Sequence, residues 1–158
     1  MFYTFTLLRF THRHCAAPCS PARLLTAESS GRREYSSLKQ CAMDYLILIN
    51  DAPYASERPY NALRLASSLD SDGKDAVRLF FLGDGAWCAV CGQDVPAGMH
   101  DIESMMRRFL AGQRRAGVCG TCMDARGIKS GMLIEGAYRS SLDELTAWTA
   151  EAVKVLVF

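Results

Sequence analysis

From residue 43 onward, the chain alternates between short apolar runs and longer stretches in which apolar residues recur at helical spacing. The short runs predict strands buried in a sheet, and the longer stretches predict amphipathic helices. Strands are predicted at residues 45–49, 77–82, 116–119, 131–134 and 153–158. Helical segments are predicted at residues 56–69, 87–91, 100–112, 124–126 and 141–152.

Two capping signals support these helices. Ser56 is a suitable N-cap for the first helix, and the last helix opens on Ser141-Leu142-Asp143-Glu144, a capping box. Because helices separate most of the strands, the order predicts an α/β fold with a mostly parallel sheet and helices on both of its faces. A length of 158 residues suits one domain with one core.

The first 42 residues differ from the rest in composition. They are rich in Ser, Arg and Thr, show no sustained period, and carry six Arg and Lys residues against two Glu. Met43 stands directly before the first predicted strand. We therefore predict a domain at residues 43–158, and a disordered extension, an over-long gene start or a targeting segment at residues 1–42.

Bulk composition narrows the class of protein. The formal net charge of +1 does not indicate binding to nucleic acid or to a membrane surface. No stretch reaches the roughly 20 apolar residues that a membrane-spanning helix needs. The seven cysteines form an odd set, unlike the disulfide framework of a secreted domain. We expect a cytoplasmic protein with reduced thiols, available for metal, redox or nucleophilic chemistry.

The most informative motif is Cys119-Gly120-Thr121-Cys122, which follows the third predicted strand. Ligands of open α/β sheets gather just beyond the carboxyl ends of strands. If the next turn is helical, its free N–H groups and dipole lower the pKa of a thiol there and favour the nucleophilic thiolate.

Residues around this motif fit a reactive site. Arg126 would add positive potential, Asp124 would partly oppose it, and Gly120 allows another segment to pass closely. Cys119 and Cys122 are therefore the candidate catalytic residues. The alternative is that both cysteines are buried and only pack as small apolar side chains.

A second cysteine pair, Cys88 and Cys91, raises the question of a metal. Together with Cys119 and Cys122 it has the pattern of a four-thiolate zinc site, although the segment between the pairs is longer than in zinc ribbons. On a helix, Cys88 and Cys91 would share one face, so core packing is the alternative. We predict no metal and no other cofactor, with these four cysteines as the alternative metal set. His100 lacks a nearby second histidine and is predicted to be a surface or cap residue.

Four sequence blocks carry a resemblance to a known family. They are 80–85 (FFLGDG), 91–93 (CGQ) followed by Pro96 and Gly98, 102–106 (IESMM) and 118–127 (VCGTCMDARG). In these blocks the chain resembles the DsrE/DsrF-like sulfur-relay family, over about residues 44–158. The resemblance implies a three-layer α/β/α fold with a parallel sheet of about five strands. It also implies a cytoplasmic homo-oligomer, often a trimer or hexamer.

The resemblance further implies a function. Some members carry sulfur as a persulfide on a cysteine at the end of the third strand, a position that Cys119 matches. This implies a sulfurtransferase-like relay protein that takes sulfur from a donor protein and passes it to an acceptor thiol. The relay carriers usually have a single cysteine there, so the role of Cys122 stays open. The alternatives are a thiol–disulfide redox protein using Cys119 and Cys122, and a non-enzymatic zinc or interaction module using both cysteine pairs.

Overall fold

The structure, a computed structural model, describes residues 43–71, 76–112 and 114–158, so the predicted extension at residues 1–42 lies outside the described residues. Its elements in chain order are β1 (Asp44–Ile49), α1 (Arg58–Leu69), β2 (Ala76–Phe81), the 3-10 helix η1 (Gly83–Ala89), α2 (Ile102–Leu110), β3 (Arg115–Cys119), α3 (Gly120–Ala125), the 3-10 turn η2 (Ser130–Met132), β4 (Ala137–Ser140), α4 (Leu142–Glu151) and β5 (Lys154–Val157). None of the helices in this part of the chain has the length and apolar character needed to cross a membrane.

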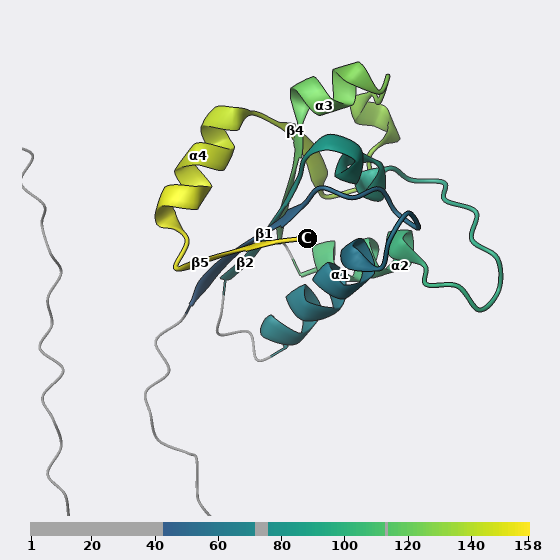
Figure 1. Cartoon of the computed structure of the whole chain (residues 1–158), viewed down its shortest axis with the longest axis horizontal. Coiled ribbons are helices and arrows are strands. Elements are labelled where there is room, and N and C mark those ends of the chain that lie inside the picture. The colour runs from purple at the N-terminus through teal and green to yellow at the C-terminus, as the bar shows by residue number, and fades with distance from the viewer. Residues whose placement is uncertain (1–42, 72–75, 113) are drawn as a thin grey trace, which may run out of the picture. The chain divides into compact units, whose positions relative to one another are not determined.

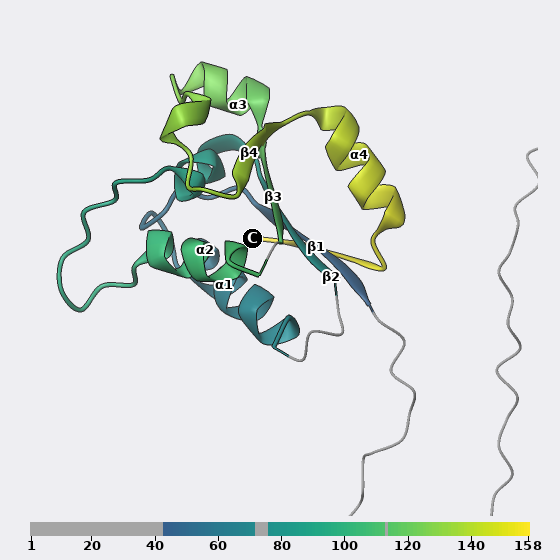
Figure 2. The same cartoon turned by 180° about the vertical axis from the view of Figure 1, so that it is seen from behind.

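The strands form one five-stranded sheet in the order β4-β3-β2-β1-β5, and every neighbouring pair is parallel. Helices α1 and α2 lie on one face of this sheet and α4 lies on the other (Figures 1 and 2). The predicted three-layer α/β/α fold with a parallel sheet is therefore confirmed. Because parallel strands end at the same edge, η1 and α3, which follow β2 and β3 directly, come together there.

Two apolar clusters hold the layers together, one on each face of the sheet. Ile47 on β1 belongs to the larger cluster, to which α1 and α2 contribute, whereas its neighbour Leu46 belongs to the smaller cluster with residues of α4. This division follows from the alternation of side chains along a strand. In the smaller cluster the ring of Phe80 meets that of Trp148 edge to face, with centroids 6.1 Å apart. Cys119 also belongs to the smaller cluster, which anchors the end of β3.

The strand predicted at residues 131–134 is wrong. Leu133 forms only an isolated antiparallel bridge with Val90, and the N–H of Ile134 donates to the carbonyl of Ala89 at 2.8 Å. These apolar residues are thus placed against the end of η1 rather than in the sheet. The strand that joins the sheet is β4, at its edge, where partly exposed residues give no continuous apolar run to predict it.

The two short helices begin earlier than predicted. Helix η1 starts at Gly83, directly after β2, and ends at Ala89, so Cys91 lies beyond it and does not share a helix face with Cys88. Helix α3 starts at Gly120 rather than at residue 124.

Of the two N-cap predictions, the one for α4 is confirmed. The Ser141 hydroxyl accepts a hydrogen bond from the N–H of Glu144 at 3.2 Å and caps α4. The Glu144 carboxylate accepts from Tyr138 and Ser140, so the structure shows only the N-cap half of the predicted capping box. The N-cap of α1 is Glu57 rather than Ser56, although the Ser56 hydroxyl still accepts from the N–H of Arg58 at 3.3 Å.

Candidate functional site

The candidate site lies where β3 ends and α3 begins, at the carboxyl edge of the sheet (Figure 2). Cys119 is the last residue of β3 and Gly120 is the first residue of α3, so no linker separates strand from helix. The free N–H groups of the first helical turn, those of Thr121 and Cys122, act on the Cys119 sulfur and lower the pKa of its thiol. A helical turn therefore follows the thiol directly, and its N-terminus lies at Cys119.

The Cys119 thiol is the more acidic of the pair. Its side chain is buried, and its sulfur lies 3.2 Å from the Thr121 hydroxyl oxygen. Burial raises the pKa of the thiol, but hydrogen bonds from the Thr121 and Cys122 side chains and from their N–H groups outweigh it, so the pKa of Cys119 is lowered. A lower pKa increases the fraction of thiolate, which is the nucleophilic form of cysteine.

The Cys122 thiol has the opposite character. Burial and the hydrogen bond that it gives to Cys119 raise its pKa, more than the N–H of Gly83 lowers it. That N–H, from the start of η1, donates to the Cys122 sulfur at 3.1 Å. Cys122 is therefore held as a neutral thiol that donates to the Cys119 sulfur, so the two cysteines are chemically unequal.

Thr121 provides a test of this asymmetry. Thr121→Val removes the hydroxyl donor, so the pKa of Cys119 should rise and less thiolate should be present at pH 7. We expect alkylation of Cys119 by iodoacetamide at pH 7 to slow by about two- to fivefold. Thr121→Ser keeps the hydroxyl and should react at nearly the wild-type rate. Equal rates for the two variants, measured by peptide mass spectrometry, would show that the hydroxyl does not stabilise the thiolate.

The guanidinium of Arg126 contacts Cys122 rather than Cys119. Its Nη1 donates to the carbonyl of Cys122 at 3.1 Å, and its Nε and Nη2 donate to the Asp84 carboxylate at 2.9 and 2.7 Å. This ion pair joins α3 to η1. These contacts hold the Cys122 backbone and pair the charge of Arg126 with Asp84, and the supporting role of Arg126 stays a prediction.

Arg139, a residue that the sequence pattern did not single out, occupies the space around Gly120 and Asp124. It lies on β4, donates to the two Asp124 carboxylate oxygens at 2.9 and 2.7 Å, and places its guanidinium against Gly120. Asp124 therefore has a cationic partner instead of acting on the thiol alone. Because the sequence pattern predicts the fourth strand at residues 131–134, it gives no indication that Arg139 lies on a strand beside the cysteine motif.

The structure does not bring the two cysteine pairs together. Cys88 is fully buried, donates from its sulfur to the Asp51 carbonyl at 3.5 Å, and has a pKa raised to about 12 by burial and the nearby Asp51 charge. Cys91 is exposed. Within the described residues, no three or more His, Cys, Asp or Glu side chains gather in a way that could hold a metal ion. The four-cysteine zinc arrangement therefore finds no support in this geometry.

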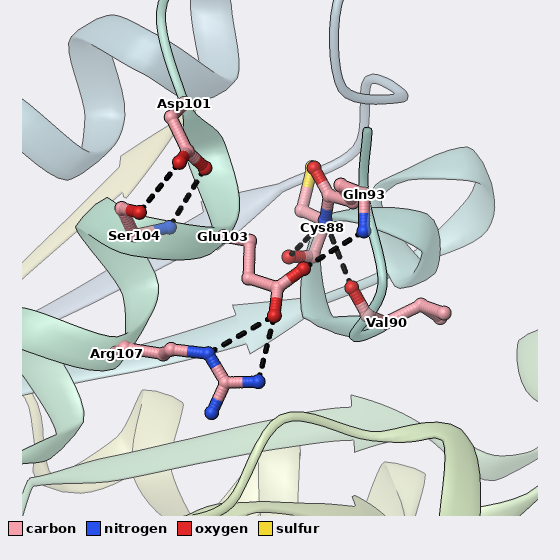
Figure 3. A network of polar contacts seen from close by, with 7 residues as sticks. All are labelled: Cys88, Val90, Gln93, Asp101, Glu103, Ser104 and Arg107. Carbon is pink, nitrogen blue, oxygen red and sulfur yellow. Dashed lines mark hydrogen bonds and ion pairs between the residues drawn. The ribbon is translucent and has the colours of Figure 1, made fainter. Parts of the chain in front are cut away.

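A second polar cluster fixes the loop between η1 and α2 (Figure 3). The Glu103 carboxylate accepts from the N–H of Gln93 at 2.8 Å and from Arg107 at 2.6 and 3.0 Å. The hydrogen bond from Gln93, followed by that from Arg107, lowers the pKa of Glu103. Near the same loop, the exposed ring of His100 stacks on Tyr60 with centroids 3.6 Å apart. Gln93 and Glu103 fall in two of the blocks that carry the family resemblance, and their contacts here hold the loop in place.

The class of protein is defined by its three-layer α/β/α fold, with a cysteine of lowered pKa at the end of the third strand. The DsrE/DsrF-like family model matches residues 43–158, and the chain belongs to this family. It is 38% identical to Protein YchN of Escherichia coli over 114 residues, which is 72% of this chain and 97% of that protein. An uncharacterised protein of Methanocaldococcus jannaschii is 33% identical over 116 residues, 73% of this chain and all of that protein (100%).

Solved structures agree with this family assignment. The crystal structure of YchN from E. coli superposes with a TM-score of 0.68 at 37% identity, covering 73% of this chain and 99% of that one. A protein of unknown function from Methanobacterium thermoautotrophicum superposes with a TM-score of 0.60 at 12% identity, covering 73% of this chain and 99% of that one. The second likeness concerns the fold alone.

Proposed function

We propose that this domain is a sulfur-relay protein that carries sulfur as a persulfide on Cys119 and passes it to an acceptor thiol. The observation that carries the proposal is the inequality of the two thiols: the pKa of Cys119 is lowered and that of Cys122 is raised. A nucleophile and a neutral hydrogen-bond donor thus stand together at the carboxyl edge of the sheet. Membership of the DsrE/DsrF-like family, in which sulfur relay is common, supports the same chemistry.

In this proposal the Cys119 thiolate attacks the outer sulfur of a donor persulfide. A sulfur–sulfur bond forms at Cys119, the donor's own sulfur–sulfur bond breaks, and the donor leaves as a thiolate. An acceptor thiolate then attacks the same outer sulfur, and Cys119 leaves as a thiolate. A lowered pKa favours both the first step, by supplying thiolate, and the second, because a more acidic thiol is a better leaving group.

Intact mass spectrometry tests this proposal. The reduced protein is incubated with a cysteine desulfurase and cysteine, and its mass is then measured before and after treatment with dithiothreitol. We expect a gain of one sulfur atom on the peptide that contains Cys119, which dithiothreitol removes. An unchanged mass on that peptide, with the desulfurase active, would contradict the proposal.

The partners follow from this chemistry. A donor protein and an acceptor protein of a relay are required, and the cytoplasm is the proposed location because thiols stay reduced there. We also propose homo-oligomers, since Val153, just before the edge strand β5, and Val155 and Val157 on it are 58%, 39% and 63% exposed. An exposed apolar stripe of this kind is typical of a contact surface. Light scattering should give a multiple of the monomer mass, and a monomer would contradict this assembly.

A thiol–disulfide redox function is the second candidate. The observation that favours it is the mutual effect of the Cys119 and Cys122 side chains on each other's pKa, because neighbouring thiols can form a disulfide. In that case Cys122 attacks a mixed disulfide at Cys119, releases the partner thiol and leaves a Cys119–Cys122 disulfide. This function predicts a reversible loss of two hydrogen atoms in place of a gain of one sulfur.

A further inference from the structure

Arg139 lies near the candidate site but forms no bond in the proposed sulfur transfer. It lies on the edge strand β4, where Val118 of β3 is its register partner and Cys119 is the partner of Ser140. Side chains alternate along a strand, so Arg139 leaves the sheet on the face opposite Tyr138 and Ser140. The side chains of Tyr138 and Ser140 both donate to Glu144 of α4, at 2.7 and 2.6 Å, whereas Arg139 reaches toward α3.

The guanidinium of Arg139 fills the space beside the first residue of α3. A Cβ atom on Gly120 would lie 2.9 Å from the Cζ and Nη2 atoms of Arg139 and 3.0 Å from its Nε atom. Gly120 therefore admits the guanidinium at this point, and a larger residue would displace it. Since Gly120 directly follows Cys119, the positive charge stands next to the helix N-terminus that binds the thiol sulfur.

Asp124 holds the guanidinium in this place. Two nitrogens of Arg139 donate to the two carboxylate oxygens of Asp124, a paired geometry that fixes orientation as well as distance. The hydrogen bond to Asp124 raises the pKa of Arg139, burial lowers it by less, and the charges of Asp124 and Cys119 raise it further. Asp124 lies one helical turn beyond Gly120, so the same helix that binds the sulfur also orients the arginine.

The elements packed at this edge carry several other charged or titratable groups. They are Cys122 and Asp124 on α3, Arg126 at its C-terminal cap, Asp84 on η1, Tyr138 and Arg139 on β4, and Glu144 on α4. Arg126 is paired with Asp84 and the Cys122 carbonyl, and Glu144 accepts from Ser140 and Tyr138. Of these cations, Arg139 is the one whose guanidinium lies against Gly120, the residue next to Cys119.

We infer that Arg139 is the counter-charge of the Cys119 sulfur, a positioning residue that Asp124 orients and that favours the anionic form of this sulfur. Its role toward the thiolate stands on the geometry alone. Its role toward the terminal sulfur of a persulfide rests on the proposed function. In both states the guanidinium lies beside Gly120, the residue next to Cys119, and adds positive potential at the end of β3 where the sulfur carries its charge.

The test is the pH profile of Cys119 alkylation by iodoacetamide in the full chain, followed by peptide mass spectrometry. Arg139→Gln should slow the reaction at pH 7 by about two- to fivefold and move the midpoint of the profile to higher pH, an effect limited by solvent screening. Arg139→Lys keeps the charge and should restore most of the rate. Arg115→Gln removes the same charge at the opposite end of β3 and should leave the profile unchanged.

A measurement on the wild type tests the inference even if the Arg139→Gln variant does not fold. Raising the salt concentration from low to high should slow Cys119 alkylation in the wild type, because salt screens exposed charges, and should have less effect in Arg139→Gln. The inference fails if Arg139→Gln reacts like Arg115→Gln, or if salt has no effect on the wild type. Sulfur loading is a separate measurement: a wild type that alkylates as expected but never gains sulfur would overturn the proposed function and leave the counter-charge standing.

Discussion

Cys119→Ser is expected to abolish sulfur loading, whereas Cys122→Ser is expected to keep it. A serine hydroxyl does not ionise near neutral pH and cannot hold a transferable sulfur, so no mass gain should remain in Cys119→Ser. A serine at position 122 still donates a hydrogen bond to the Cys119 sulfur and accepts one from the N–H of Gly83, as the thiol does. We expect loading of Cys122→Ser within about twofold of the wild type, since a hydroxyl replaces one hydrogen-bonding group by another.

The control for this experiment is Cys91→Ser, which removes an exposed thiol away from the site and should load like the wild type. If Cys119→Ser gains as much sulfur as the wild type, the assignment of Cys119 as the sulfur carrier is wrong. Equal loss of activity in Cys119→Ser and Cys122→Ser, with a reversible disulfide in the wild type, would instead identify the redox function. The two candidate functions therefore separate on a single set of variants.

Gly85→Ala is expected to destabilise the domain strongly. A Cβ atom at this position would lie 2.1 Å from the carbonyl oxygen and 2.8 Å from the carbonyl carbon of Ile49. Ile49 is the last residue of the buried strand β1, and its carbonyl oxygen accepts from the N–H of Leu82 at 3.0 Å. The Ile49 carbonyl therefore cannot move away without breaking this hydrogen bond. We expect a loss of about 3 kcal/mol in the free energy of unfolding, at the upper end of overpacking effects.

Urea denaturation measures this loss, with Gly131→Ala as the matched control. Gly131 is exposed, and a Cβ atom added there would meet nothing within 4 Å, so the same methyl group should change stability by less than about 0.5 kcal/mol. Similar midpoints for the two variants would show that η1 can move away from β1. Because η1 also supplies the Gly83 donor to Cys122, Gly85→Ala should in addition alter the reactivity of the cysteine pair.

Much of the fold was accessible from the sequence because burial leaves a local pattern. Continuous apolar runs mark β1 and β2, which are central strands covered on both faces, and helical spacing marks α2. The same reasoning failed for β4, an edge strand whose residues are partly exposed and so leave no apolar run. The apolar residues Leu133 and Ile134 predict a strand instead, but their segment packs against the end of η1.

For the candidate site, the sequence by itself determined that Cys119 ends a buried strand, because a short apolar run leads up to it. It placed the next helical turn at residues 124–126, whereas the structure begins α3 at Gly120, directly after the thiol. Only the tertiary structure decided which charges meet the thiol and this helix. Asp84 engages Arg126, Gly83 engages Cys122, and Arg139 approaches Gly120 through contacts between separate elements. Such contacts depend on strand order and register, which leave no trace in the spacing of residues.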